Sequence, residues 1–226
     1  ERLYLRSMIL LKQVGYLLRK ELKLELRSNY AISGILLYVL ATVFVVYRVF
    51  IRLEPNVWNA MFWVVLLFAS VNAVVKSFIQ ESGARQLYYY TLADPIAVIL
   101  SKMIYNAALL LVISFLVWGG FVFFGGSPVK EMTLFLLALL LGSVGFSITF
   151  TFVSAISAKA DNNATLMAIL AFPLVIPILM TVLKLTAGAL RLLRDTSVNN
   201  DMFILLGIDL LLLAMALVLY PFLWRD

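Results

Sequence analysis

Long apolar runs are the feature that most limits how this chain can fold. Five stretches of about 20 residues or more carry few charges, and a sixth is equally apolar but contains Asp209. The six runs cover residues 31–51, 57–77, 103–124, 132–157, 164–187 and 202–222. A helix of about 20 apolar residues crosses the hydrocarbon core of a bilayer, and continuous rather than alternating runs argue against a transmembrane β-barrel. The sequence therefore predicts an all-α, polytopic membrane protein with six transmembrane helices.

Composition excludes the common classes of soluble protein. Of the 226 residues, 64% are hydrophobic and 13% are charged, whereas soluble domains are about half apolar and a quarter charged. A soluble enzyme, a nucleic-acid-binding module and a disordered chain are therefore excluded. The absence of cysteine and histidine removes disulfides, thiolate nucleophiles, Cys/His metal sites and histidine ligands for haem iron. We expect no catalytic residue, no metal site and no cofactor bound by this chain, and no nucleic acid as a partner.

Basic residues indicate how the chain is oriented in the membrane. With six spans, twelve of the eighteen Lys and Arg residues fall on the side of the two termini. These are Arg2, Arg6, Lys12, Arg19, Lys20, Lys23, Arg27, Lys76, Arg85, Lys102, Lys159 and Arg225. The other six are Arg48, Arg52, Lys130, Lys184, Arg191 and Arg194. Because cytoplasmic segments are enriched in Lys and Arg, we expect both termini in the cytoplasm.

The N-terminal segment, residues 1–30, has the pattern of an amphipathic helix. Its apolar residues recur at helical spacing, at Leu10, Leu11, Val14, Leu17, Leu18 and Leu22. Its basic residues lie on the other flank, at Lys12, Arg19, Lys20 and Lys23. Such a helix suits the anionic headgroups of the cytoplasmic leaflet, and the alternative is an elbow helix that also docks a cytoplasmic partner. We divide the chain into an interfacial helix, 1–30, and a six-span domain, 31–226.

A cleaved signal peptide is the competing interpretation of the run 31–51. Thirty residues precede this run, more than the charged region of a signal peptide contains, and no small-residue cleavage site follows it. We therefore expect the run to be retained as the first span.

The segment between the second and third runs, residues 78–102, is longer and more patterned than the other connections. Glu81 and Arg85 are four residues apart, which is a favourable spacing for an ion pair on a helix. Gly83 allows another backbone to approach closely. Lys102 opens the next apolar run, where we expect it to anchor the helix at the headgroups.

This segment resembles the signature of type-2 ABC-transporter permeases. That signature has an acidic residue, one further residue and a glycine, followed by a leucine-containing helix, a proline and a lysine. The matching positions are Glu81, Gly83, Leu87, Leu92, Pro95 and Lys102. The resemblance implies a cytoplasmic coupling helix, with Glu81, Gly83, Arg85, Leu87, Leu92 and Pro95 at the contact with an ATPase. The chain departs from the pattern at Ala84 and Gln86, where many such permeases have Thr and Glu.

Two longer stretches resemble one subfamily, CcmB, the permease subunit of the cytochrome c maturation ABC complex. They are residues 58–78 and 139–180, and the second contains a Leu-x-x-Pro-Leu-x-Ile-Pro pattern that ends at Pro177. The resemblance implies a bacterial inner-membrane complex with a CcmA-like ATP-binding subunit, a CcmC-like haem-handling subunit, a CcmD-like small subunit and a second permease copy. Haem is then a substrate of the complex, which either delivers haem or releases a haem-loaded chaperone.

If ATP drives movement of this protein, a partner chain must bind the ATP. No Gly-x-x-x-x-Gly-Lys-[Ser/Thr] motif, whose backbone amides cradle nucleotide phosphates, occurs in the sequence. The alternatives are a type-2 permease for another lipophilic substrate, a secondary transporter or channel, and an intramembrane enzyme. A transporter would show repeated halves or broken spans, and an enzyme would show converging catalytic groups.

Asp209 is the only acidic residue deep inside a run. An ionisable residue at that depth costs about 2.5–3.5 kcal/mol on insertion scales and faces the protein interior with a partner. Lys184 is predicted to lie in the same outer half of the membrane, so the sequence predicts a Lys184–Asp209 ion pair. A proton relay is the alternative, but it needs further acids or histidines.

Small residues and prolines indicate how the spans pack. Gly142 and Gly145 allow close helix approach, either within this chain or against another subunit. Pro173 and Pro177 each remove a backbone hydrogen bond from the fifth run, producing either a static kink or a hinge.

Overall fold

A computed structural model describes residues 2–27, 29–50, 53–79, 94–159, 164–192 and 198–225. All regular structure in these residues is helical, as the sequence predicts. The helices are α1 (Arg2–Arg27), α2 (Asn29–Val49), α3 (Pro55–Ile79), α5 (Pro95–Gly125), α6 (Met132–Lys159), α7 (Ala164–Ala189) and α8 (Val198–Arg225).

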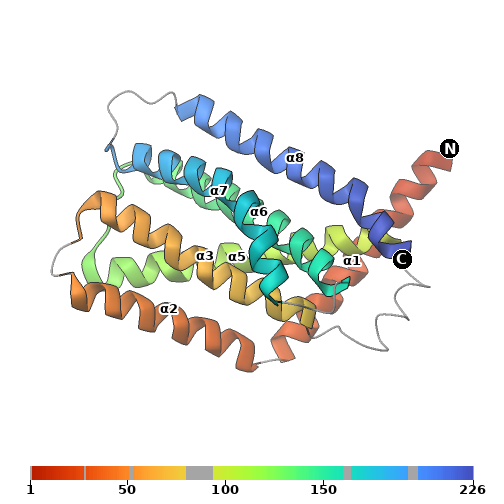
Figure 1. Ribbon diagram of the computed structural model, residues 1–226, viewed down its shortest axis with the longest axis horizontal. Coiled ribbons are helices and arrows are strands. Elements are labelled where there is room, and N and C mark those ends of the chain that lie inside the picture. Colours follow the sequence, from red (N-terminus) through yellow and green to blue (C-terminus); the bar gives the residue numbers. More distant parts are fainter. Residues whose placement is uncertain are drawn as a thin grey trace.

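Six of the helices form a bundle, and α1 crosses one end of it (Figure 1). Helix α6 is central, because it contacts α3, α5, α7 and α8. In its most apolar part, 72% of the residues are buried inside the protein, against 22% for α8 at the periphery. The first turn of α1 and the last turns of α8 lie at the same end of the bundle (Figure 1).

Five of the helices are long and apolar enough to cross a membrane. The qualifying stretches are Pro55–Val74, Pro95–Gly125, Met132–Ala158, Ile169–Ala189 and Val198–Phe222. The first predicted span, 31–51, is helical as α2, but its described side chains form a shorter apolar helix, Ser33–Val49. A multi-pass membrane protein is thus confirmed, and the sixth span stays a prediction.

Helix α5 begins earlier than the apolar run predicted. Asp94 is its N-cap, with Oδ1 accepting a hydrogen bond from the backbone N–H of Ile96 at 2.9 Å, and Pro95 is its first residue. A proline suits this position because its missing N–H has no helical partner there. The helix ends before Gly126, whose φ of 80° favours glycine. The two turns before residue 103 are therefore helical, although they are more polar than the run.

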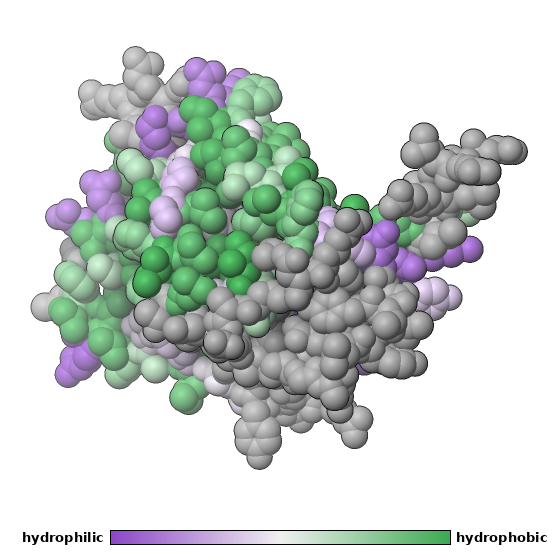
Figure 2. Space-filling model, turned by 45° about the vertical axis from the view of Figure 1, so that its right-hand side comes forward, coloured by the Kyte–Doolittle hydropathy of each residue, from purple (hydrophilic) through white to green (hydrophobic). Residues whose placement is uncertain are grey.

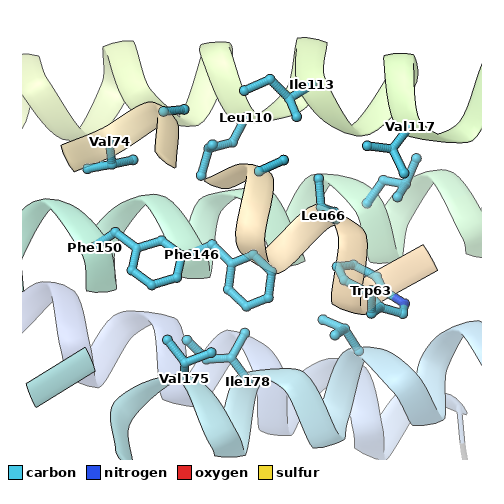
Figure 3. Packing of buried hydrophobic residues seen from close by; sticks show 14 of the residues in the cluster. Trp63, Leu66, Val74, Leu110, Ile113, Val117, Phe146, Phe150, Val175 and Ile178 are labelled. Atoms are coloured by element: carbon cyan, nitrogen blue, oxygen red, sulfur yellow. The ribbon is translucent and has the colours of Figure 1, made fainter. Parts of the chain in front are cut away.

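Aromatic side chains fill the interior of the bundle near the first turns of α3. Trp58 and Phe62 of α3 stack with ring centroids 5.3 Å apart, and Phe62 meets Phe121 of α5 edge-on at 6.0 Å. Figure 3 shows the neighbouring layer, where Trp63 of α3 and Phe146 of α6 meet edge-on with ring centroids 6.0 Å apart. Since lipid tails are as apolar as these side chains, close packing rather than the hydrophobic effect holds such helices together.

The outside of the bundle is apolar. Large exposed hydrophobic side chains cover α8 and α2, including Phe203, Leu210, Leu211 and Phe222 on α8 and Leu37 on α2. In the coloured part of Figure 2, hydrophobic residues cover most of the surface and hydrophilic residues lie mainly near the edges. This distribution matches a surface that faces lipid.

Candidate functional site

The predicted coupling residues are divided between two parts of the chain. Glu81, Gly83, Arg85, Leu87 and Leu92 lie outside the residues that the structure describes. The last predicted coupling residue, Pro95, is the first residue of α5. The coupling helix itself therefore stays a prediction, while the point at which its segment enters the bundle is defined.

A buried ion pair lies close to this entry point. Lys102 of α5 places its Nζ 3.5 Å from Oε1 of Glu21 in α1, and the two residues are only 3% and 7% exposed. Lys20 Nζ lies 3.2 Å from the same carboxylate oxygen. Helix α5 starts seven residues before Lys102 and α1 covers the lysine, so the role of Lys102 as a headgroup anchor stays a prediction.

A second contact joins the same two helices. The backbone N–H of Asp94 donates to Oε1 of Gln13 in α1, with a nitrogen–oxygen distance of 3.4 Å. The Asp94 side chain caps α5 at the same time. Neither the Gln13–Asp94 contact nor the Glu21–Lys102 contact could be predicted from the sequence pattern, because the two residues of each pair are 81 positions apart.

Helix α1, predicted as an amphipathic interfacial helix, has one face against α5 and leaves apolar side chains exposed elsewhere. The helix is present, but Val14 is buried whereas Leu11 and Leu22 are 69% and 51% exposed. Residues seven apart share a helix face, so Val14 and Glu21 together face α5. Beside the exposed leucines lies a row of exposed basic residues, Lys12, Arg19 and Lys23. One face of α1 thus packs against the bundle, and another face is exposed.

The predicted Lys184–Asp209 ion pair is not formed. Lys184 Nζ instead lies 3.1 Å from Oδ1 of Asp201, in the first turn of α8. Asp209 is eight residues further along α8, about 12 Å away at 1.5 Å per residue. The sequence pattern missed Asp201 because that residue stands just before the apolar run 202–222.

Asp209 is buried against a glycine. Its side chain is 5% exposed, and neither carboxylate oxygen has a hydrogen-bond partner among the described residues. A Cβ built at Gly145 of α6 would collide with this carboxylate and come within 3.2 Å of Ile178 in α7. Similarly, a Cβ at Gly142 would lie 2.6 Å from the Trp63 ring of α3. Both glycines therefore make close contacts within this chain.

Helix α7 continues through both of its prolines. Pro173 and Pro177 lie inside the helix Ala164–Ala189, and the Thr181 hydroxyl donates to the Pro177 carbonyl at 2.7 Å. This i−4 bond is of the kind that bends helices slightly. The alternatives of static kink and hinge stay open.

Side-chain hydrogen bonds join helices that the sequence pattern could not pair. Asn106 Nδ2 of α5 donates to Thr151 Oγ1 of α6 at 2.8 Å. The Thr186 hydroxyl of α7 lies 2.6 Å from Asn59 Oδ1 and 3.0 Å from Trp63 Nε1, both on α3. Such bonds stabilise helix association in lipid by about 0.6 kcal/mol each. Their role is to connect helices.

The described residues contain no group of three or more acidic, histidine or cysteine side chains able to hold a metal ion. Their polar side chains tie helices to one another. The fold and these contacts define a multi-pass, α-helical membrane protein.

Comparison with family models identifies the family. The model described as CcmB protein matches residues 12–224, so the chain belongs to the CcmB family. This family comprises permeases of the haem exporter in cytochrome c maturation, which work with the CcmA ATPase in an ABC transporter. Comparison with curated proteins finds no match to this chain.

Proposed function

We propose that this chain is the membrane subunit that converts ATP hydrolysis by a separate cytoplasmic ATPase into movement during cytochrome c maturation. The observation that carries the proposal is the family match over residues 12–224, nearly the whole chain. The residues proposed to meet the ATPase are Glu81, Gly83, Arg85, Leu87, Leu92 and Pro95. The movement either delivers haem or releases a haem-loaded chaperone, and ATP is bound by the partner.

The proposed orientation places α1 and the start of α5 at the cytoplasmic face of a bacterial inner membrane. The Lys and Arg distribution supports this orientation. Its support from the fold is that the start of α1 and the end of α8 lie at one end of the bundle (Figure 1). Single cysteines at positions 86 and 197 test it: a membrane-impermeant thiol reagent applied to intact cells should label Ser197→Cys but not Gln86→Cys. The reverse labelling contradicts the topology.

The partners follow from the same proposal. They are a CcmA-like ATPase, a CcmC-like and a CcmD-like membrane subunit, and a second copy of this chain. Membrane lipid is a further partner, because the exposed leucines of α1 lie beside the exposed basic residues Lys12, Arg19 and Lys23. That arrangement suits a helix at an anionic membrane surface.

Substitutions in the coupling segment test the function. Glu81→Lys reverses the charge offered to the ATPase, and Gly83→Leu blocks close backbone approach. Each variant should reach the membrane at a normal level but copurify less ATPase, or hydrolyse ATP without maturing c-type cytochromes. Full ATPase binding together with full maturation in both variants would contradict the proposal. If deletion of this protein leaves cytochrome c maturation intact, the result favours the alternative function, a permease for another lipophilic substrate.

A further inference from the structure

Two contacts in matching register join α1 to the start of α5. Gln13 meets Asp94, and Glu21 meets Lys102. The contact residues are eight apart in each helix, so the two helices run in the same sense through the joint, over about 12 Å. A joint with two such contacts fixes both the position and the direction of α1 relative to α5.

Burial makes the ion pair of this joint difficult to separate. Glu21 and Lys102 are both nearly inaccessible to solvent. Withdrawing the partner of a buried charge costs far more free energy than withdrawing the partner of an exposed one. Val14, on the same face of α1, is buried as well. The joint therefore resists both sliding and opening.

The position of the joint gives it a mechanical consequence. Asp94 is the first described residue after the segment proposed to meet the ATPase. At the other side of the joint, α1 ends at Arg27 and α2 begins at Asn29, so α1 leads almost directly into the next helix. A displacement that arrives at Asp94 reaches both α5 and, through α1, α2.

We propose that Glu21 and Lys102 are positioning residues that make α1 and the first two turns of α5 one rigid unit during the ATP-driven step. The inference rests on the proposed function, and it adds the route by which movement reaches two membrane helices together. Neither residue touches nucleotide or substrate in this scheme. Their role is to keep α1 and α5 from moving separately.

Cellular assays of single and paired variants test the need for the joint. Glu21→Gln and Lys102→Met should each lower the yield of mature c-type cytochrome, per assembled complex, about tenfold, while ATP hydrolysis continues. A tenfold change corresponds to about 1.4 kcal/mol, within the range of couplings between contacting residues. The paired variant Glu21→Leu with Lys102→Met restores an apolar joint and should recover most of the yield. Tyr16→Phe, an exposed change on the same helix outside the basic row, is the matched control.

Spin-label distances test whether the unit is rigid. Nitroxides are attached at Tyr16→Cys on α1 and Ile104→Cys on α5, both exposed positions in a chain without native cysteine. In the purified complex, the distance between the labels should be the same with and without trapped ATP. The Glu21→Gln background should broaden the distance distribution. This measurement needs no cytochrome assay and is made only on assembled complex, so poor folding of a variant cannot imitate the result.

Two outcomes would overturn the inference. One is full cytochrome yield in both single variants, and the other is a nucleotide-dependent change of several ångströms between the labels in the otherwise unaltered chain. Failure of the proposed function has a different signature, because the unaltered chain would then copurify no ATPase.

Discussion

The two ends of the bundle use ion pairs that differ in how far the lysine is buried. At the end crossed by α1, Glu21 and Lys102 are 3.5 Å apart, with side chains only 8% and 4% exposed. At the other end, Lys184 and Asp201 are closer, at 3.1 Å, and the aspartate side chain is only 7% exposed, but the lysine side chain is 60% exposed. Exposed pairs contribute about 0–1 kcal/mol, whereas breaking a buried pair costs several times more. Burial, not distance, therefore decides which end holds its helices more firmly.

The largest expected effect is at the buried end. Lys102→Met should lower the free energy of unfolding by about 2–3 kcal/mol, because Glu21 loses a buried charged partner; the side chain of Lys20, another cation beside it, is 25% exposed. Thermal unfolding of the purified chain in one fixed detergent measures the change. A loss no larger than that of Lys184→Met in the same detergent would remove the difference between the two ends.

The comparison extends to the middle of the bundle, where the buried Asp209 carboxylate has no hydrogen-bond partner among the described residues. Gly145→Ala should destabilise the chain by about 1–3 kcal/mol, because the new methyl group meets the Asp209 carboxylate and Ile178. Adding Asp209→Ala should recover part of the loss. Gly207→Ala is the matched control, since nothing lies within 4 Å of a Cβ built there. Equal effects at positions 145 and 207 would show that α6 and α8 are not in close contact.

The smallest effect is expected at the exposed end. Lys184→Met should change the free energy of unfolding by less than about 1 kcal/mol. When Lys184→Met is combined with Asp209→Asn, the two changes in the free energy of unfolding should add to within about 0.5 kcal/mol. The reason is that Lys184 pairs with Asp201 and not with Asp209. Compensation between the two substitutions in the same unfolding assay would instead restore the ion pair expected from the sequence.

Sequence patterns predict those features that depend on residues near one another in the chain. The apolar runs give five of the membrane-crossing helices, and the spacing of leucines gives α1, since both signals repeat within a single helix. The early start of α5 was missed because the apolar run marks the hydrocarbon core, whereas Asp94 and Pro95 mark the helix.

Contacts between distant residues could not be predicted in this way. Glu21 looks like any charged residue of an amphipathic helix, and only the fold brings Lys102 to it. Lys184 and Asp209 were paired because both are charged residues near the outer side, but position along α8 favours Asp201. Asn59 and Thr186 gave no signal at all, because single polar residues in apolar runs do not indicate which helix they face.

The length of α5 has a consequence for the membrane itself. Its 31 residues extend about 46 Å, well beyond the roughly 30 Å of a typical hydrocarbon core. From Lys102 to the end of the helix at Gly125 the rise is about 35 Å, close to a core crossed at a modest tilt. On the proposed orientation, the Glu21–Lys102 pair lies at the cytoplasmic boundary of the hydrocarbon. A thicker bilayer would take in this buried pair as well, so we expect the depth of the pair to give the chain a preferred membrane thickness.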